Sequence, residues 1–375
     1  MTICVGPRNR RLLLCCYEVP GYGGASTAGY DLFRRMTSDG IDAQFVNLIA
    51  ERDWEFFSNT FGPQLGNPAC LPGVHNFVVS SVGRPQLELQ DFIEDGSPDV
   101  IVGIGAVATS ILQENARRRR LVFYAGGCGQ AEIMILAGYA ADAMGLQRVF
   151  ERARYAPRIL SRSERNSFRA ADLVIANSSM TREFFAHTFA REVGKIYRRI
   201  VWSAEWTYQS ARQYRSSARP FEEREIGLLF AASSWDRAIK NYAMVKRIAA
   251  RCPHVAIHIA GDVSSRVPGA VHHGLISNRA LIELMGDTRT VVCPSLVDSA
   301  PGILYEASAM GCNIVTSRNC GNWSLCHPDL LAERCHVDEF IQCVNRSLTR
   351  SYPDNIGRFL DHGSYSDLVE TLMVI

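Results

Sequence analysis

The sequence contains very little lysine, and neither sign of charge dominates its composition. Of its 40 basic residues only Lys195, Lys240 and Lys246 are lysine, and 38 acidic residues leave a formal net charge of +2 at pH 7. So small an excess creates no strong electrostatic field, and nucleic acid is therefore not the expected main partner. The scarcity of lysine also draws attention to the place of each of these three residues.

The sequence also lacks the long apolar runs and the cysteine spacings that mark membrane spans, metal sites and disulfide frameworks. The apolar run at 12–16 follows Arg8, Arg10 and Arg11, but it is too short for a signal-peptide core or a membrane span. Twelve Cys occur without a C-x-x-C pair or a Cys/His cluster at zinc spacing. We therefore expect a cytoplasmic protein with reduced cysteines and no structural zinc.

Length and periodicity predict two doubly wound α/β domains. A chain of 375 residues exceeds what one hydrophobic core usually organises. Short apolar runs alternate with segments of helical period, as in parallel sheets covered by helices. The predicted strands lie at 12–16, 43–49, 76–80, 99–104, 121–124 and 172–177 in the first half, and at 226–231, 255–260, 290–293 and 313–316 in the second.

The domain boundaries follow from one polar, Arg-rich stretch at 206–224, which contains Pro220 and is the predicted linker. We therefore expect an N-terminal, acceptor-side domain at 1–205 and a C-terminal, ligand-binding domain at 225–350. The remaining segment, 351–375, is expected to pack back on the first domain.

The strongest chemical signal is the segment DSAPGILYEA at 298–307, which follows the predicted strand 290–293. Asp298 and Glu306 are separated by seven residues and flank a Pro-Gly turn, after which the sequence predicts a helix at 303–310. A helix N-terminus presents unpaired backbone N–H groups and a partial positive charge, and so suits an anion. A diphosphate is the expected occupant.

Two cations form a second candidate feature. Arg237 and Lys240 follow the predicted strand 226–231, at the start of a predicted helix that also carries Lys246. Because Arg237 and Lys240 are three residues apart, both side chains could face the same phosphates from one helical turn. The alternative is a capped helix start with two solvated cations, and the pair taken alone leaves both interpretations open.

Glycine-rich turns follow two of the predicted strands. Gly23 and Gly24 come after the first strand, where a glycine turn is common in doubly wound folds. The turn at 126–129 would either let the backbone approach an acceptor or simply reverse the chain tightly. Cys128 within it has no evident base nearby in the sequence, so it is not expected to be a nucleophile.

Taken in order, these features resemble the retaining GT-B glycosyltransferases of the large nucleotide-diphosphate-sugar family (glycosyl transferases group 1, family four). The matching series in the second half is Arg237 and Lys240, IAG at 259–261, HGLI at 273–276, PS at 294–295, the segment 298–307 and MG at 310–311. The family's hallmark is two Glu separated by seven residues, and here Asp298 takes the first position and Glu306 the second. The first half matches more loosely, through Gly23, Gly24 and ADLVIANS at 171–178.

The resemblance implies a GT-B fold, in which two Rossmann-like domains face a central cleft, and it implies roles for single residues. Glu306 would accept hydrogen bonds from the ribose hydroxyls, and Asp298 would contact the hydroxyls of the transferred sugar. Lys240 and Arg237 would neutralise the departing diphosphate, which makes them, with Asp298, the expected catalytic set. The other expected donor-binding residues are Gly302 and Ile303, whose N–H groups would hold the distal phosphate, Leu304, Ser299, Gly23, Gly24, Gly274 and Ile276.

The resemblance also implies an activity. The chain would move a sugar from a nucleotide-diphosphate sugar to a glycan, a lipid-linked saccharide or a natural product, with retention of anomeric configuration. No cofactor and no metal are expected, and the sequence contains no D-x-D motif. A lipid-linked acceptor would bring the protein to the inner face of the membrane, whereas the basic run at 117–120 is interpreted as a solvated helix end.

Two departures from the family pattern motivate other hypotheses. The side chain of Asp298 is one methylene shorter than that of Glu, so its carboxylate reaches about 1.5 Å less far. The loops at 103–107 and 124–130 contain no His, although many family members carry one after the fourth or fifth strand. A non-catalytic GT-B subunit that binds nucleotide or a partner glycosyltransferase is therefore the second hypothesis. A GT-B sugar epimerase or phosphorylase is the third.

Overall fold

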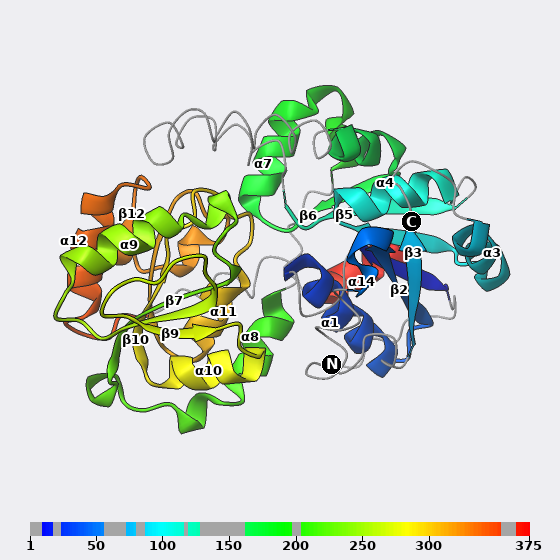
Figure 1. Cartoon of the computed structure of the whole chain (residues 1–375). Coiled ribbons are helices and arrows are strands. Elements are labelled where there is room, and N and C mark those ends of the chain that lie inside the picture. Colours follow the sequence, from blue (N-terminus) through cyan, green and yellow to red (C-terminus); the bar gives the residue numbers. More distant parts are fainter. Residues whose placement is uncertain are drawn as a thin grey trace.

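The computed structural model describes residues 10–17, 24–55, 73–79, 87–115, 119–127, 162–196, 204–353 and 365–375. These residues form two lobes, each built around a six-stranded sheet whose paired strands are parallel (Figure 1). The strand order is β3-β2-β1-β4-β5-β6 in the first lobe and β12-β11-β10-β7-β8-β9 in the second. Each order runs outward in both directions from a central strand, which is the doubly wound arrangement that the sequence predicts.

The first sheet is covered on both faces. Its strands are β1 (Leu12–Tyr17), β2 (Ala43–Ala50), β3 (Val74–Val79), β4 (Val100–Ile104), β5 (Arg120–Ala125) and β6 (Leu173–Ala176), and its helices include α1 (Gly24–Ser38), α3 (Leu87–Gly96), α4 (Ala106–Asn115) and α7 (Ser179–Thr188). Leu12 and Leu14 join a buried cluster with α1, whereas Leu13 and Cys15 join another with α3 and α4. Successive strand residues point to opposite faces, so β1 must be apolar throughout.

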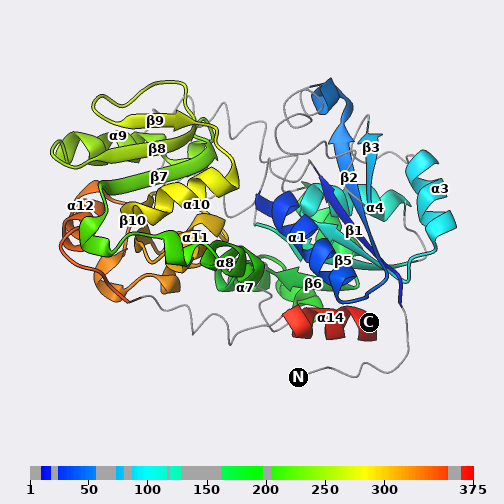
Figure 2. The same ribbon diagram turned by 90° about the horizontal axis from the view of Figure 1, so that it is seen from below.

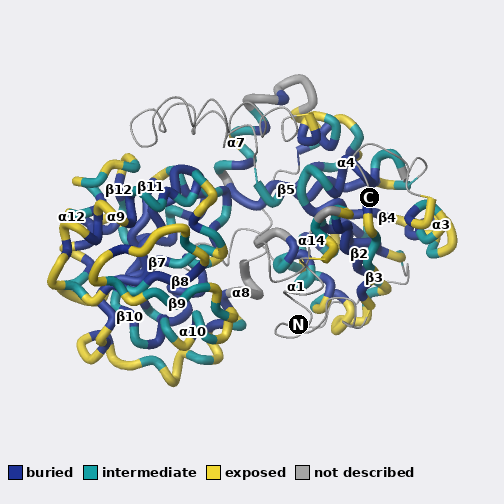
Figure 3. Tube along the Cα trace, in the orientation of Figure 1, coloured by how far each residue is buried: buried dark blue, intermediate teal, exposed yellow. Residues whose placement is uncertain are grey.

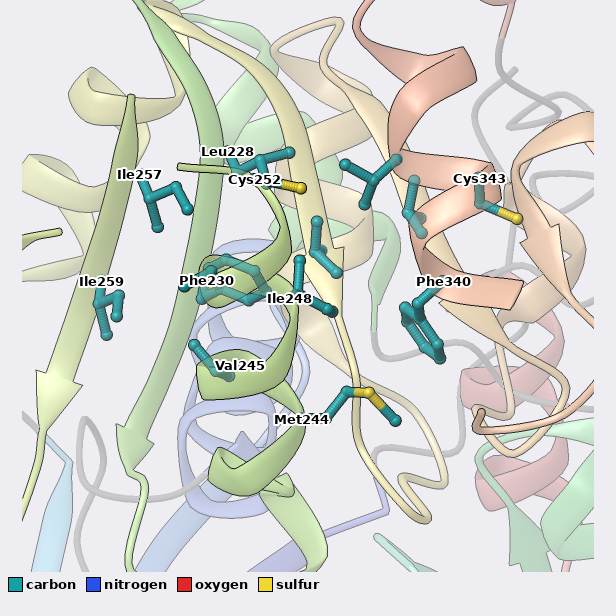
Figure 4. Close-up of a cluster of buried hydrophobic side chains, with 14 of the residues drawn as sticks. Leu228, Phe230, Met244, Val245, Ile248, Cys252, Ile257, Ile259, Phe340 and Cys343 are labelled. Carbon is teal, nitrogen blue, oxygen red and sulfur yellow. The ribbon is translucent and has the colours of Figure 1, made fainter. Parts of the chain in front are cut away.

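The second sheet is built in the same way. Its strands are β7 (Ile226–Ser234), β8 (Ile257–Asp262), β9 (Val271–Gly274), β10 (Thr288–Cys293), β11 (Asn313–Ser317) and β12 (Leu331–Ala332), and its helices are α9 (Tyr242–Arg251), α10 (Asn278–Gly286), α11 (Gly302–Ala309) and α12 (Val337–Ser347). Leu228 and Phe230 pack against α9 and α12, as Figure 4 shows. Leu229, between them, points to the other face and packs with α10 and α11.

The chain passes between the lobes twice. Helix α8 (Ala204–Arg212) begins two residues before the predicted linker 206–224, which also contains two short 3-10 turns, η4 (Arg215–Ser217) and η5 (Phe221–Glu223). Helix α8 contacts α11 of the second lobe and α1 of the first. At the end of the chain, α14 (Tyr365–Val374) places Leu368 and Leu372 in the apolar core of the first lobe (Figure 2). The domain boundaries themselves stay a prediction.

Burial follows the layers. The central strands of both lobes are buried, whereas the edge strands β3 and β9 and the outer helices and turns carry exposed positions (Figure 3). Of the helices that the structure describes, none is both long and apolar enough to span a membrane.

The sequence predicts ten of the strands to within a few residues, because each is an apolar run. It misses the edge strands β9 and β12. β12 has only two residues, and β9 consists of exposed Val271, two histidines and Gly274, so neither presents an apolar run. Short, polar edges of this kind avoid further strand pairing, and they leave no strand signal in the sequence.

Candidate functional site

The candidate site lies where the strands of the second sheet end. β7 and β10 are neighbours in that sheet, and both are followed by the segments that the sequence analysis singles out. After β7 the chain forms a single 3-10 turn, η6 (Ala238–Lys240), and after β10 it runs through a loop into α11. Because parallel strands end at the same edge, two segments that are distant in the chain meet there, at the usual ligand edge of an open α/β sheet.

Lys240 and Asp298 form an ion pair at this edge. Lys240 Nζ donates to Asp298 Oδ2 at 2.5 Å, and the two side chains are 20% and 14% exposed. Burial acts to lower the pKa of Lys240, but the carboxylate of Asp298 opposes it and leaves the pKa above its usual value. Lys240 is therefore a fixed positive charge at neutral pH. Arg237 is near enough for its charge to act against that of Lys240, and its own side chain is exposed.

The turn that carries Lys240 is fastened to the loop after β10. Leu296 donates its backbone N–H to the carbonyl of Ile239 at 2.8 Å, and the side-chain amide of Asn241 donates to the carbonyl of Pro294 at 3.0 Å. These two hydrogen bonds lie on either side of Lys240 in the sequence. They hold its backbone against the segment that leads to Asp298.

The prediction of one helix that carries Arg237, Lys240 and Lys246 is wrong. Asn241 adopts the left-handed conformation, with a φ of 58°, and separates η6 from α9, which begins at Tyr242. Arg237 is the extended residue before η6, and Lys246 lies on α9, where Nζ donates to Ser265 Oγ at 2.7 Å. Asn tolerates the left-handed region better than most residues, and its side chain is used here to bond the β10 loop.

The backbone around Asp298 is held by the loop after β11. The backbone N–H of Asp298 donates to the carbonyl of Asn319 at 3.1 Å, and the backbone N–H of Gly321 donates to the carbonyl of Asp298 at 2.8 Å. A Cβ at Gly321 would lie 1.7 Å from the carbonyl oxygen of Ser299, so no other residue fits without moving this segment. Gly321 was missed by the sequence analysis, and its only sequence signal is a glycine shortly after a predicted strand.

Helix α11 begins at the exposed Gly302, with Pro301 before it. Pro301 has no N–H, and the first N–H groups of a helix have no partner within it, so the amides of the exposed Gly302 and the half-buried Ile303 lack a partner within α11. Leu304 differs: its amide donates to the carbonyl of Pro301 at 3.2 Å and its side chain is fully buried in the core. Leu304 thus stabilises the start of the helix and presents no free polar group.

Glu306 is buried one turn into α11, with 8% of its surface exposed. Its Oε1 accepts a hydrogen bond from the side-chain amide of Asn278, the first residue of α10, at 2.6 Å. Burial raises the pKa of Glu306, the hydrogen bond from Asn278 opposes that rise, and the charge of Asp31 adds to it. Asp31 belongs to α1 of the first lobe, and burial raises its own pKa to about 6. The first lobe is therefore near enough for a charge on it to act on Glu306.

The loop that leads into α10 contains the predicted base-binding residues. Gly274 ends β9 with a φ of 66°, Ile276 is half-buried, and the Oγ of Ser277 accepts from the amide of Ala280 as the N-cap of α10. This loop delivers Asn278 to Glu306.

A pair of histidines lies on the neighbouring strands β8 and β9, the second of which leads into this loop. His273 Nε2 and His258 Nδ1 are 3.0 Å apart, and burial together with neighbouring histidines lowers the pKa of each. Among the described residues, no three His, Cys, Asp or Glu side chains are grouped as a metal site would require.

The two lobes touch at the candidate site. Ser299 Oγ donates to the carbonyl of Gly126, just after β5 of the first lobe, at 3.2 Å. Gly321 also lies against the hydroxyl of Ser178, the N-cap of α7. The strand ends of the first sheet thus approach the loop around Asp298. Ser299, a predicted donor-binding residue, already uses its hydroxyl in this contact.

Arg224 fixes the far end of α11. Its guanidinium is almost fully buried and donates to the carbonyls of Thr288, Met310 and Gly311 at 2.7 to 3.0 Å. Met310 and Gly311 end α11, so Arg224 satisfies carbonyls that the helix leaves without partners. In the sequence Arg224 lies in the polar stretch predicted as a linker, where no role is expected for it.

Comparison with known proteins finds similarity in fold but none in sequence families. No protein-family model matches the chain, and no curated protein matches its sequence. The fold matches HepE of Anabaena, solved with UDP and glucose, with a TM-score of 0.63 over 97% of this chain and 99% of that one, at 14% identity. Sucrose-phosphate synthase of Thermosynechococcus elongatus gives 0.64 over 90% of both chains at 13% identity. UDP-GlcNAc 2-epimerase of Methanocaldococcus jannaschii gives 0.51 over 97% and 99% at 10% identity.

The chain has the GT-B fold. Identities this low show the fold alone, because both transferases and an epimerase share it. Within this GT-B chain, Lys240, Asp298 and the start of α11 meet at one strand edge. Glu306 lies one turn further along α11 and is hydrogen-bonded to Asn278, which follows the loop after Gly274. Gly24 begins α1 of the opposite lobe. Gly23 and Cys128 lie outside the described residues.

Proposed function

We propose that this GT-B chain is a glycosyltransferase that takes a sugar from a nucleotide-diphosphate sugar and passes it to an acceptor hydroxyl. The acceptor would be a glycan, a lipid-linked saccharide or a natural product, and the anomeric configuration would be retained. One observation carries the proposal: the segment 298–306 has an ion-paired Asp298 at one end, a buried Glu306 at the other and the free amides of α11 between them. Complexes of HepE with UDP and with UDP-glucose support this class of donor.

Each part of the segment suits one part of the donor. The amides of Gly302 and Ile303 would bind the distal phosphate, which a helix N-terminus favours. The carboxylate of Glu306 would accept from the ribose hydroxyls, and Asp298 would bind hydroxyls of the transferred sugar. Gly274 and Ile276 would border the base.

Catalysis in this proposal is mainly electrostatic. When the bond between the anomeric carbon and the phosphate oxygen breaks, negative charge grows on the leaving diphosphate. Lys240 is charged and already fixed in place, so its stabilisation of the diphosphate increases toward the transition state. Arg237 adds a second cation at the exposed side. The departing phosphate oxygen would take the proton of the acceptor hydroxyl while the acceptor oxygen forms its bond to the anomeric carbon. Because Lys240, Arg237 and the amides of α11 would meet the charge on the diphosphate, no metal ion is required in this proposal.

Release of nucleoside diphosphate tests the proposal. The protein is incubated with a panel of UDP-, ADP- and GDP-sugars, and slow hydrolysis of one of them is expected even without an acceptor. Glu306→Ala should abolish the release while the protein stays folded. Release that persists unchanged in Glu306→Ala would show that another site, or a contaminant, is responsible.

A non-catalytic GT-B subunit is the second candidate. It is favoured by the short Asp298 side chain, one oxygen of which is already engaged by Lys240. This candidate predicts that a nucleotide binds with dependence on Glu306 but that no donor is turned over with any acceptor mixture. An epimerase would instead return a nucleotide sugar of altered configuration, which product analysis in the same assay detects.

A further inference from the structure

We propose that Asn278 is a positioning residue that orients the carboxylate of Glu306 toward the ribose of the bound nucleotide. The inference rests on the proposed function, because it concerns the same site. It adds a residue that lies outside the motif at 298–307 and that takes no part in the assignments above. Its basis is the hydrogen bond from Asn278 Nδ2 to Glu306 Oε1, at 2.6 Å.

The backbone on both sides of this hydrogen bond is fixed. Ser277 caps α10 through its Oγ, and its carbonyl accepts from the amide of Leu281 at 3.0 Å, so Asn278 stands at a closed first helical turn. Helices α10 and α11 share one buried cluster, in which Ile282 and Met285 meet Leu304 and Ala307. The two partners are thus held at a set spacing by the core and not by their own contact alone.

The hydrogen bond leaves Glu306 free for a diol. An ionised carboxylate has about four acceptor positions, and the amide of Asn278 takes one of them on Oε1. Within the described part of the chain, Oε2 accepts no hydrogen bond. A ribose with its 2′ and 3′ hydroxyls would donate to Oε2 and to the remaining lone pair of Oε1. By holding Oε1, Asn278 would select the rotation of the carboxylate that presents Oε2 and the remaining lone pair of Oε1 to the ribose.

The hydrogen bond also keeps the carboxylate in its acceptor form. Burial and the charge of Asp31 on α1 both raise the pKa of Glu306, and the amide of Asn278 from α10 counteracts them. Asp31 is the only charged group among the described residues that acts on the pKa of Glu306. The neighbouring Arg279 is exposed and pairs with Glu283. Without Asn278 the carboxylate would take up a proton at a higher pH, and a protonated acid accepts fewer hydrogen bonds.

The test uses the tightest-binding of UDP, ADP and GDP, together with its 2′-deoxy counterpart. Calorimetry measures both affinities over roughly pH 5 to 8, where a raised carboxyl pKa titrates. Asn278→Ala should weaken binding of the ribonucleotide by roughly two- to tenfold. It should also reduce the ratio between the affinities for the ribonucleotide and the deoxynucleotide. The pH at which nucleotide affinity falls on acidification should also be higher in this variant than in the wild type. Arg279→Ala alters the next residue, which is exposed. It should leave the ribonucleotide affinity, the preference for ribose and the pH dependence at their wild-type values.

The variant Asn278→Asp distinguishes a role of Asn278 in positioning Glu306 from a role in stabilising the start of α10. An acid in the first turn of a helix favours folding, because it interacts well with the helix dipole. The same change removes the donor and puts a like charge beside Glu306, so nucleotide affinity should fall further than in Asn278→Ala. A purely structural role for Asn278 predicts unimpaired binding in this variant, and that result would overturn the inference.

The proposed function and the role of Asn278 are contradicted by different results. If Glu306→Ala leaves nucleotide affinity unchanged, the proposed function is wrong and the inference falls with it. If Glu306→Ala weakens binding but Asn278→Ala keeps the affinity, the ribose preference and the pH profile of the wild type, only the inference is wrong. In the double variant, Asn278→Ala should add nothing to the effect of Glu306→Ala.

Discussion

Lys240 and Asp298 are 58 residues apart in the chain, yet Nζ of the first lies 2.5 Å from Oδ2 of the second. They meet because β7 and β10 are adjacent in the sheet. The turn that follows β7 and the loop that follows β10 are joined by a backbone hydrogen bond. The predicted cation and the predicted sugar-binding carboxylate are therefore one unit. A donor diphosphate would approach a lysine that is already charged and oriented.

Lys240→Ala should lower kcat by on the order of a hundredfold, comparable to the loss of one oxyanion-stabilising donor. The reason is that Lys240 would meet charge that develops only as the bond to the diphosphate breaks. Nucleotide-sugar affinity should fall much less than kcat. Steady-state kinetics with the donor found in the panel measure both.

Lys246→Ala is the matched control for that experiment. Lys246 lies on α9, beyond the break at Asn241, and its ammonium group contacts Ser265 and the ring of Tyr242. Its removal should change kcat little. Equal and small effects of the two substitutions would show that Lys240 is only a structural partner of Asp298.

Turnover should survive EDTA. The charge on the leaving diphosphate is met in this account by Lys240, Arg237 and the amides at the start of α11, and none of these is removed by a chelator. The measurement is the release of nucleoside diphosphate before and after treatment. Loss of release that magnesium or manganese restores would contradict the account of the diphosphate site.

Gly321→Ala should impair both the fold and the activity. The added Cβ would stand 1.7 Å from the carbonyl oxygen of Ser299, so the loop around Asp298 has to move. A lowered melting temperature and a reduced kcat/KM are expected. Gly194→Ala is the control, because a Cβ there meets nothing within 4 Å. If Gly321→Ala melts and turns over like the wild type, the loop is not held as described.

Acid should destabilise the protein through the His258–His273 pair. Burial and neighbouring histidines lower the pKa of both side chains, whereas in the unfolded chain they titrate near 6.5. As the pH falls below about 6.5, the unfolded state therefore binds protons that the folded state does not, and the free energy of unfolding decreases.

Melting temperatures at two values of pH test this linkage. In His273→Gln the fall in melting temperature between roughly pH 7.5 and 5.5 should be smaller than in the wild type. His254→Gln alters an exposed histidine and should keep the wild-type difference. An unchanged difference in His273→Gln would remove the histidine pair from the acid response.

The sequence predicts the layers of this fold because buried parallel strands are apolar on both faces, as β1 is. It also predicts the start of α11, because Pro-Gly after a strand marks a turn into a helix. What it cannot supply is the pairing of Lys240 with Asp298, since that depends on strand order. The break at Asn241 is also missed, because helical periodicity continues across it.

Other residues of the site escape the sequence for a different reason. Asn278 is a polar residue at a helix start, and Arg224 is one of many arginines in a polar stretch, so neither stands out in composition. Their roles come from what the fold brings to them. Asn278 meets a buried carboxylate, and Arg224 meets two carbonyls just after α11 and the carbonyl of Thr288 at the start of β10. Contacts of this kind become visible only when the helices are placed.

A thermal-shift screen across nucleoside diphosphates and nucleotide sugars tests the central claim, that the edge around α11 binds a nucleotide. A ligand at 100 times its Kd should add about 2.7 kcal/mol to the free energy of unfolding, which is a readily measured rise in melting temperature. The account predicts that at least one nucleoside diphosphate and its sugar conjugate stabilise the wild type. It also predicts that Glu306→Ala loses most of that shift at the same ligand concentration. No stabilisation by any member of the panel, or an equal shift in Glu306→Ala, would contradict it.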